Sequence, residues 1–124
     1  MPTILLIDDE EDIRALVSIL LQDAGYAVCE AGNGAEGLAL LTANAVDLII
    51  LDVVLPDISG WEVCRRVKAM PATAAIPVVI FTVRSQMYDE ARLASVHPDA
   101  FINKPFARTE LLETLVRVLA GRGA

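Results

Sequence analysis

The sequence predicts an α/β fold built around a parallel sheet. Short apolar segments that are typical of strands alternate five times with segments whose apolar residues recur at helical spacing. The strand-like segments stay apolar almost to their ends, as expected for strands that are covered by helices on both faces. A chain of 124 residues is long enough for one such domain and too short for two. We therefore expect one domain over residues 1–120, followed by a short disordered tail at residues 121–124.

The first half of the chain is expected to contain three strands, at residues 3–8, 26–30 and 46–52. Apolar residues at helical spacing predict a helix between the first two strands, and Gly25 is a suitable residue to end it. Asn33, with Glu36 three residues later, predicts the N-terminal cap of a second helix, which ends at Asn44.

The second half is expected to contain two strands, at residues 76–82 and 100–103. Ser59 and Glu62 predict a capping box at the start of a third helix that runs to about Met70. A weaker helical pattern passes through Ala91 and Leu93. The last helix is predicted from apolar residues that share one face, namely Leu111, Leu112, Leu115, Val116 and Leu119.

The charge of the chain argues against direct binding to nucleic acid. Ten Lys and Arg against 17 Asp and Glu give a net charge of −7, and a pI of about 4.5 means that the protein repels phosphate backbones. Charged residues interrupt the most apolar stretches, so no membrane-spanning segment is predicted. The first residues lack the features of a signal peptide, and we therefore expect a soluble cytoplasmic protein.

The cysteines and the histidine offer little for a metal site or a catalytic triad. Cys29 and Cys64 are too few and too far apart for a zinc site, and their apolar neighbours predict buried thiols. His97 is the only histidine of the chain and precedes Pro98 in a turn-like stretch, so we expect it to be a loop residue.

Polar residues gather where the predicted strands end. Asp8 and Asp9 end the first strand, Asp52 the third and Thr82 the fourth, and Lys104 follows the fifth. Each residue alone has a structural explanation such as helix capping. In an open parallel sheet, however, the carboxyl ends of the strands form the ligand site, so these side chains should converge there. Oxygen ligands without Cys or His favour a hard cation, and Mg²⁺ suits a site with few carboxylates and a phosphoryl oxygen.

These residues resemble those of the receiver domains of two-component response regulators, and the resemblance spans essentially the whole chain. The matching segments follow the order of the family: Leu6-Ile7-Asp8-Asp9-Glu10, Leu51-Asp52-Val53-Val54-Leu55-Pro56 with Gly60, Phe81-Thr82, and Lys104-Pro105-Phe106. The resemblance implies a doubly wound, flavodoxin-like three-layer sandwich. Its five-stranded parallel sheet would have the order 2-1-3-4-5 and carry five helices.

The resemblance also implies a role for each acidic residue. Asp52 is expected to be the phosphoacceptor, whose carboxylate attacks phosphorus and forms an acyl phosphate. Mg²⁺ is expected to bind the side chains of Asp9 and Asp52 and the backbone carbonyl of Val54. Asp8 is expected to act through a metal-bound water.

Other residues and partners follow from the same resemblance. Lys104 is expected to pair with Asp52 and then with the phosphoryl group, to which Thr82 would donate its hydroxyl. The Lys104-Pro105 bond resembles the cis peptide of the family. Phe101 stands where the family has its switch aromatic, often Tyr. A histidine kinase or histidine phosphotransfer protein would supply the phosphoryl group to a monomer or weak homodimer, which would signal to an unknown protein target.

Three positions depart from the commonest pattern of the family. Val83 replaces the usual Ala or Gly after Thr82, and its branched side chain would crowd the approach to phosphorus. Phe101 has no hydroxyl with which to form a hydrogen bond. Val54 and Arg84 flank the entry of hydrolytic water and offer no obvious general base, although Arg84 could pair with phosphoryl oxygens.

Three alternatives are weaker. A phosphatase of the haloacid-dehalogenase type needs a second acid two residues beyond its nucleophilic Asp, where this chain has Val54. A flavin-binding module of the flavodoxin type would have its phosphate repelled by the clustered acids. A degenerate receiver that binds without phosphorylation is disfavoured by the intact acidic set with Thr82 and Lys104. We therefore expect a signalling switch and not an enzyme, either stand-alone or taken from a longer protein, with no output domain after its last helix.

Overall fold

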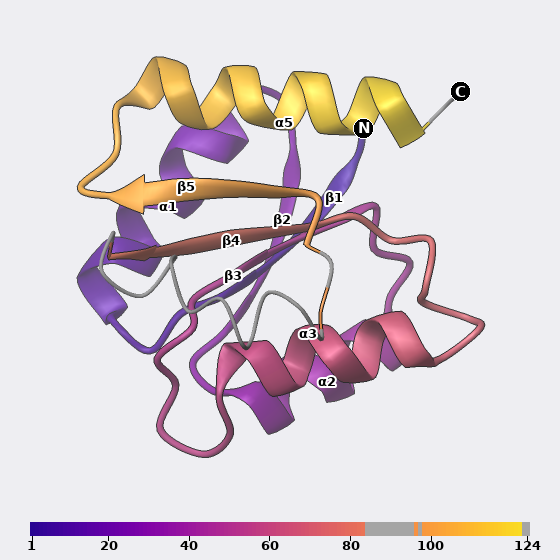
Figure 1. Cartoon of the computed structure of the whole chain (residues 1–124). Helices are drawn as coiled ribbons and strands as arrows, with labels where there is room; N and C mark the ends of the chain where they lie inside the picture. Colours follow the sequence, from indigo (N-terminus) through magenta and orange to yellow (C-terminus); the bar gives the residue numbers. More distant parts are fainter. Residues whose placement is uncertain (84–95, 97, 123–124) are drawn as a thin grey trace.

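The computed structural model describes residues 1–83, 96 and 98–122, and it contains one five-stranded sheet (Figure 1). All strand pairs are parallel, and the order is β2-β1-β3-β4-β5, as predicted. The strands are β1 (Thr3–Ile7), β2 (Ala27–Ala31), β3 (Leu48–Leu51), β4 (Val78–Val83) and β5 (Ala100–Lys104).

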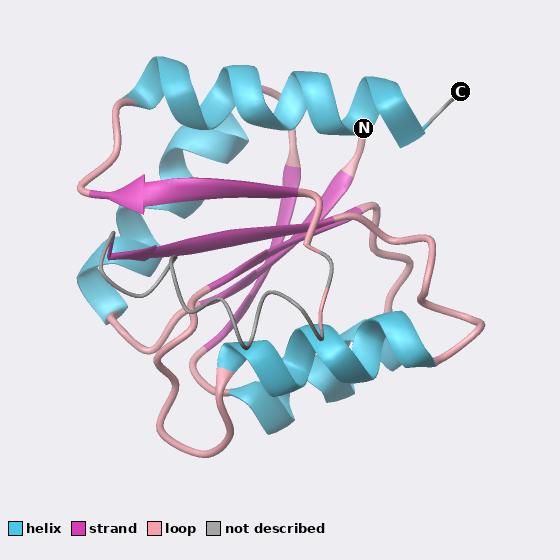
Figure 2. Cartoon of the chain, viewed as in Figure 1, coloured by secondary structure: helices cyan, strands magenta, loops and turns pink. Residues whose placement is uncertain are grey.

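Helices cover both faces of the sheet and make three layers (Figure 2). The described helices are α1 (Glu11–Asp23), α2 (Gly34–Ala43), α3 (Gly60–Ala69) and α5 (Arg108–Arg122). Buried residues of α1 and α5 share one core with the sheet, and those of α2 and α3 share the other. The predicted helix through Ala91 and Leu93 lies outside the described residues.

The central strands are buried on both faces, which explains their continuous apolar runs. Along β1, Ile4 and Leu6 pack toward α1 and α5, whereas Leu5 and Ile7 pack toward α2 and α3. All four side chains are at most 1% exposed. Successive side chains therefore pack into two separate cores, one on each face of the sheet. A strand in this position has no face that is exposed to water.

The ends of the helices agree with the predicted capping residues at most positions. Gly25 has a φ of 96°, a left-handed conformation that favours glycine after a helix end. The side chain of Asn33 accepts a hydrogen bond at the start of α2, and Asn44 caps its end. At the other terminus, α5 continues through Arg122 and includes Gly121, whose φ is not positive, so the helix extends into the predicted tail.

Only half of the predicted capping box of α3 is present. Ser59 Oγ accepts a hydrogen bond of 3.2 Å from the Glu62 backbone N–H, as expected for an N-cap. The Glu62 carboxylate does not return this bond but accepts from the side chains of Arg65 and Arg66. These two guanidinium groups lower the pKa of Glu62 to about 2.

The start of α3 lies directly against the end of β3. The backbone N–H of Gly60 donates a 2.7 Å hydrogen bond to the carbonyl of Val53. A Cβ atom at Gly60 would lie 2.1 Å from the backbone oxygen of Asp52, so no larger residue fits here without a shift of the backbone.

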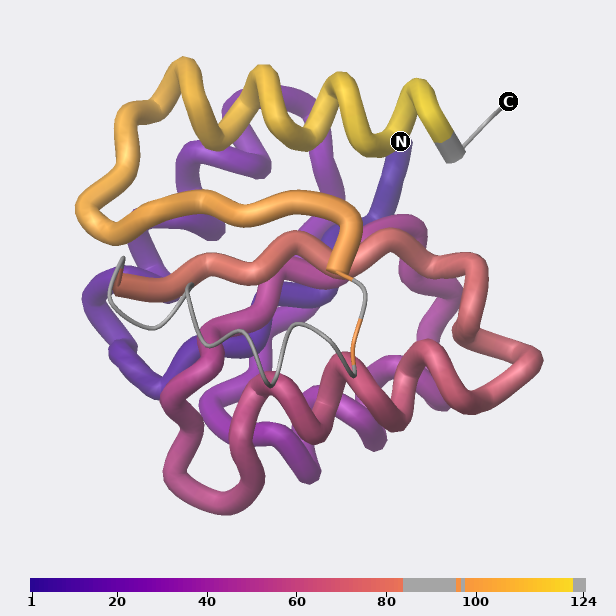
Figure 3. Tube along the Cα trace, in the orientation of Figure 1, coloured from indigo at the N-terminus to yellow at the C-terminus, as the bar shows by residue number. Residues whose placement is uncertain are grey.

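The loops at the carboxyl ends of the strands lie together at one end of the molecule. In Figure 3 the connections that follow β1, β3 and β5 all lie on the left of the view, and the N-terminus and the last turn of α5 lie on the right. Among the described helices, none combines the length and the apolar character that crossing a membrane requires.

Candidate functional site

Two strand-end acids and one lysine meet at the carboxyl edge of the sheet. Asp8 follows β1, Asp52 follows β3, and Lys104 is the last residue of β5. Backbone hydrogen bonds hold both acids in the sheet: the N–H of Asp8 donates to Ala31 at 3.1 Å, and that of Asp52 donates to Ile7 at 3.0 Å. The strand order therefore brings together residues that are far apart in the sequence.

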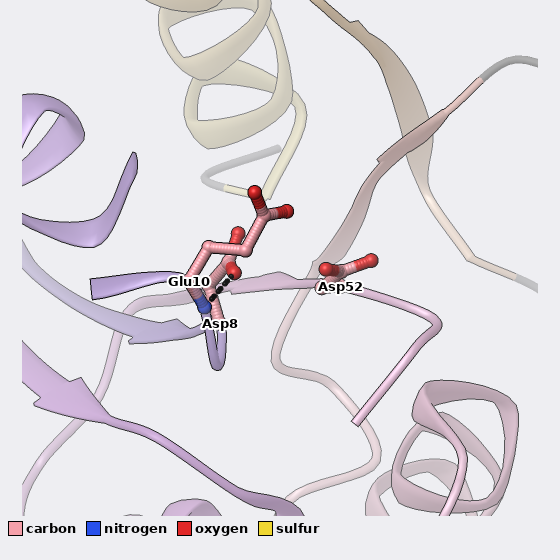
Figure 4. Close-up of side chains that lie close together, drawn as sticks. All are labelled: Asp8, Glu10 and Asp52. Carbon is pink, nitrogen blue, oxygen red and sulfur yellow. Dashed lines mark hydrogen bonds between the residues drawn. The ribbon is translucent and has the colours of Figure 1, made fainter. Parts of the chain in front are cut away.

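The ammonium group of Lys104 is bound by three carboxylates. Its Nζ lies 2.7 Å from Asp8 Oδ2, 3.0 Å from Asp52 Oδ2 and 3.0 Å from Glu10 Oε1. Figure 4 shows Asp8 and Glu10 side by side, with Asp52 next to them at the end of its strand. Asp8 is 0% exposed and Asp52 is 4% exposed, whereas Glu10 lies at the exposed rim. The predicted pairing of Lys104 with Asp52 is thus present, and Lys104 has two further acidic partners.

Burial and charge act in opposite directions on this cluster. Burial raises the pKa of Asp8, and hydrogen bonds from Lys104 and from the Glu10 backbone only partly offset that effect. Burial also lowers the pKa of Lys104, but its three carboxylate partners more than compensate, so its pKa is raised above the ordinary value. Lys104 therefore stays charged, while ionised Asp8 carries an electrostatic cost.

Replacing Asp8 with Asn should stabilise the Mg²⁺-free protein at neutral pH. The folded-state pKa of Asp8 lies above its ordinary value of 3.8, so keeping Asp8 ionised disfavours the folded state once the pH exceeds that value. Asn has the same shape without the charge. We expect a rise in Tm of a few degrees, equivalent to roughly 1 kcal/mol in a domain of this size.

The pH dependence checks the cause of that stabilisation. Below the ordinary value of 3.8, Asp8 is protonated in both the folded and unfolded chain, so the advantage of Asp8→Asn should fade as the pH is lowered toward 3.8. Thermal unfolding followed by circular dichroism between neutral pH and pH 4 measures this. A difference in Tm that does not change with pH would contradict the electrostatic explanation.

Local hydrogen bonds orient the two buried acids. Asp8 Oδ1 accepts from the Glu10 backbone N–H at 2.8 Å, the bond that is dashed in Figure 4. The carbonyl of Asp8 accepts from Arg14 Nη1 at 2.7 Å. Asp52 Oδ1 accepts from the Val54 backbone N–H at 3.2 Å. Each carboxylate therefore has one oxygen bound to its own loop and the other bound to Lys104.

The donor set suits a hard cation. Carboxylate oxygens of Asp8, Glu10 and Asp52 lie within 4.8 Å of one another, and the set contains only oxygen. Of the residues predicted to bind Mg²⁺, the structure brings Asp8 and Asp52 together. Asp9 is exposed, and Val54 lies two residues after Asp52 in the following loop. Sequence reasoning assigned no role to Glu10. Glu10 directly follows Asp8 and Asp9 in the sequence, and this position could have indicated that it belongs to the site.

The predicted switch residues lie on β4 and β5. Thr82 is 1% exposed and is aligned with Asn103 across the β4–β5 pair. Phe101 is half-buried and packs against the core that α2 and α3 share. Val83, the last residue of β4, is 43% exposed. Arg84 lies outside the described residues.

An aromatic pair supports Lys104 from the side of β4. Nζ of Lys104 lies 5.1 Å from the ring centroid of Phe81. The ring of Phe81 meets that of Phe106 edge to face, with centroids 5.1 Å apart. These contacts fix the direction of the lysine and were not predicted.

The cysteines take no part in this site. Cys64 is fully buried, and burial raises the pKa of its thiol to about 11, so it is not a reactive thiolate at neutral pH. Cys29 is half-buried and is a free thiol. His97 lies outside the described part of the chain.

An apolar pocket of about 340 Å³ adjoins Lys104 on its other side. It lies between α1 and the connection from β5 to α5, and its lining residues are Ile13, Leu16, Leu20, Lys104, Pro105, Phe106 and Arg108. The Lys104-Pro105 peptide bond is cis, as predicted. On α1, Leu16 and Ile19 are 48% and 57% exposed.

The sequence is similar to characterised signalling proteins. The family model of the response regulator receiver domain matches residues 4–116. The DNA-binding dual master transcriptional regulator RpaA of Synechocystis sp. is 42% identical over 122 residues, which cover 98% of this chain and 50% of that protein. The chain spans about half the length of the curated relatives it matches.

Solved structures have the same fold. The chemotaxis response regulator CheY4 of Vibrio cholerae superposes with a TM-score of 0.88 at 35% identity, covering 95% of this chain and 98% of that one. The response regulator TrrA of Thermotoga maritima, solved in complex with Mg(2+)-BeF, has a TM-score of 0.85 at 31% identity, covering 95% and 99% of the two chains.

Proposed function

Because this chain belongs to the response regulator receiver family, we propose that it accepts a phosphoryl group on Asp52 and thereby switches a protein-binding surface. One observation carries the proposal: the buried carboxylate of Asp52 lies 3.0 Å from Lys104 Nζ and beside a second buried acid, Asp8. A nucleophilic carboxylate next to a fixed cation is the arrangement that aspartyl phosphorylation requires.

The phosphoryl group would come from a phosphohistidine of a histidine kinase or a histidine phosphotransfer protein. An oxygen of Asp52 forms the new bond to phosphorus, while the bond between phosphorus and the imidazole nitrogen breaks and its electron pair stays on the imidazole. Lys104 neutralises charge on a phosphoryl oxygen as the group moves toward it. Lys104 is already positioned for this, because the three carboxylates and the ring of Phe81 hold it beside Asp52.

Mg²⁺ would be bound by Asp9, Asp52 and the Val54 carbonyl, with Asp8 acting through water. Its chemistry here is to neutralise the charge of the carboxylates and the phosphoryl oxygens together. The carboxylate cluster with its oxygen atoms within 4.8 Å of one another supports a cation at this place, and Glu10 lies within the same reach. The Mg(2+)-BeF complex reported for TrrA supports the same chemistry for this chain.

The donor protein would dock on the apolar surface next to the site. Leu16 on α1 lines the pocket beside Lys104, and Ile19, which is also exposed, lies three residues further along the same helix. A helix that carries phosphohistidine and packs on this area would bring its imidazole close to Asp52. The exposed apolar residues of α1 support this, because a surface of this kind marks an interaction site.

The output would arise from Thr82 and Phe101. A phosphoryl group adds about −1.5 to −2 charge and needs hydrogen-bond donors. Thr82 carries a hydroxyl near the end of β4 and is aligned with Asn103, the residue before Lys104 on β5. Movement of Thr82 makes room for Phe101, which is half-buried and has no hydroxyl to hold it at the surface. The two states differ in population, and phosphorylation favours the inward state of Phe101.

Beryllofluoride, a mimic of the phosphoryl group, tests this switch. We expect NMR shifts of the backbone amides to extend from Asp52 through Thr82 to Phe101 when Mg²⁺ and beryllofluoride are added. Shifts confined to the residues around Asp52, with Phe101 unchanged, would place the output on another surface.

The protein itself is proposed to be a switch and not an enzyme with a separate substrate. Val54 occupies the place where a phosphatase of the haloacid-dehalogenase type needs its general acid, and its side chain is 50% exposed at that place. The test is incubation with acetyl phosphate and Mg²⁺. We expect one phosphoryl group per chain, located at Asp52 by mass spectrometry after reductive trapping. Rapid turnover of the donor without a labelled protein would contradict the proposal.

A further inference from the structure

The loop from Val53 to Ser59 carries the carbonyl that the proposed cation site uses. Both ends of this loop are fixed: Val53 accepts a hydrogen bond from the Gly60 N–H, and Ser59 caps α3. Val54 is the second residue of the loop, and its backbone N–H donates to Asp52 Oδ1. The part of the loop around Asp57 is held by bonds to a different helix.

Asp57 binds this loop to the N-terminus of α2. Its Oδ1 accepts from the backbone N–H of Gly34, and its Oδ2 accepts from that of Ala35, both at 2.8 Å. The first N–H groups of a helix have no partner within the helix, and the positive end of the helix dipole favours a carboxylate there. These bonds, from Ala35 and then Gly34, lower the pKa of Asp57 to about 2, so its charge is present at neutral pH.

The neighbouring side chain packs the same contact tightly. A Cβ atom on Gly34 would lie 2.5 Å from Cγ1 of Ile58 and 3.0 Å from Cγ2 of Val63. The backbone of α2 therefore approaches the loop as closely as glycine allows. Together, the hydrogen bonds of Asp57 and the apolar contacts of Ile58 hold this part of the loop in one position against α2.

We propose that Asp57 is a positioning residue for the cation site, which holds the β3–α3 loop so that the Val54 carbonyl stands beside Asp52. Asp57 follows Val54 by three residues, so a contact at Asp57 restrains a carbonyl that is at most about 10 Å away along the chain. Mg²⁺ needs near-octahedral ligands and gives up water reluctantly, so it tolerates a displaced ligand poorly. This inference rests on the proposed function, because it concerns the same site.

A matched pair of variants separates positioning from simple helix capping. Asn33 caps the same helix by accepting from the Glu36 N–H at 2.8 Å, but it makes this bond within its own segment. Asn33→Ala removes a cap of α2 and leaves the loop attached. Asp57→Ala removes a cap of α2 and releases the loop as well. Asp57→Asn keeps one acceptor oxygen and is the conservative variant.

The experiment is an NMR titration of backbone amides with Mg²⁺ alone, combined with thermal unfolding of each variant. We expect Asp57→Ala to bind Mg²⁺ about tenfold more weakly than the wild type, the lower end of the loss seen when residues that support metal ligands are changed. Asp57→Asn should be intermediate, and Asn33→Ala should stay within about twofold of the wild type. Hydrogen exchange at the Val54 amide, which donates to Asp52, should accelerate in Asp57→Ala only.

Three results would overturn the inference. Mg²⁺ affinity of Asp57→Ala within about twofold of the wild type would mean that the contact does not position the ligand. An equal loss of affinity in Asn33→Ala would mean that the stability of α2 alone matters. If Asp57→Ala does not fold, the Mg²⁺ affinities of Asp57→Asn and Asn33→Ala are compared instead. A weaker affinity in Asp57→Asn alone supports the inference, and equal affinities contradict it. A wild-type protein that shows no Mg²⁺-dependent shifts would overturn the proposed function too, and this outcome is recognisable before any variant is measured.

Discussion

Replacing Asp52 with Asn should abolish phosphorylation. The amide has almost the same shape as the carboxylate, but its oxygen is a poor nucleophile and carries no charge to attract a cation. Lys104 keeps Asp8 and Glu10 as partners at 2.7 and 3.0 Å, so the lysine should remain in place and the domain should fold. We expect labelling by acetyl phosphate to fall by at least about 10³-fold, since the nucleophilic carboxylate at the acceptor position is lost.

The control is Asp23→Asn, the same chemical change at an exposed position at the end of α1. Both variants are incubated with acetyl phosphate and Mg²⁺, and the intact mass of each is measured over time. Asp23→Asn should be labelled at the wild-type rate. Label that persists in Asp52→Asn at the wild-type level would move the acceptor to another residue.

Replacing Lys104 with Met should change stability, Mg²⁺ affinity and phosphorylation in different directions. The lysine side chain is 9% exposed and binds two acids that are almost fully buried. Its removal leaves the charges of Asp8 and Asp52 without a cation, and breaking a buried pair in this way costs about 3–5 kcal/mol. We expect a loss of that order in the free energy of unfolding without Mg²⁺, smaller at low pH where Asp8 is protonated.

Mg²⁺ should restore much of that stability. In the wild type a cation and the ammonium of Lys104 compete for the same carboxylates, so Lys104→Met should bind Mg²⁺ more tightly and gain more stability from it. Phosphorylation should nevertheless slow by on the order of 10²-fold, because a fixed donor to the phosphoryl oxygen is lost. Tighter Mg²⁺ binding together with slower phosphorylation would distinguish a direct role of Lys104 in the site from general damage to the fold.

Lys68→Met is the matched control. Lys68 Nζ binds Asp99 at 3.0 Å and the carbonyl of Ile76 at 2.9 Å, near the start of β4 and away from the carboxyl edge of the sheet. Its removal should lower stability without altering Mg²⁺ affinity or the rate of labelling. Urea unfolding, Mg²⁺ titration and labelling kinetics measure the three quantities. Unchanged Mg²⁺ affinity in Lys104→Met would contradict competition between the two cations.

Much of the fold follows from local patterns. The apolar runs of β1, β3 and β4 are long enough to exclude a sheet with one solvated face, and the parallel arrangement follows from their alternation with helices. Capping residues such as Asn33 and Ser59 act within four residues of themselves, so their roles can be inferred from the sequence. The strand order itself came from the family resemblance, since periodicity does not specify which strands are neighbours.

Strand boundaries were less predictable. The predicted third strand began at residue 46, but β3 begins at Leu48. Val46 is buried in the core that α2 and α3 share, and the Asp47 carboxylate accepts a hydrogen bond from the Thr3 N–H at 2.7 Å. An apolar residue can thus be buried before the strand starts, because burial depends on what packs over it and not on strand pairing.

The sequence by itself determined the chemistry of the candidate site. Carboxylates, a hydroxyl and a lysine stand at the ends of apolar segments, and in a parallel sheet those ends meet at one edge. The tertiary structure decided which atoms meet there. Lys104 and Asp8 are 96 residues apart, and β3 and β4 lie between their strands, so only the folded sheet brings Nζ to 2.7 Å from Oδ2.

Glu10 and Asp57 belong to the part that only the tertiary structure decided. Glu10 is the third partner of Lys104, and Asp57 binds α2 from 22 and 23 residues away. The raised pKa of Asp8 likewise results from burial beneath elements that are distant in the chain. The physical reason is common to all three: hydrogen bonds, burial and electrostatic shifts depend on distances between side chains from different elements, and the spacing of residues along the chain contains no such distances.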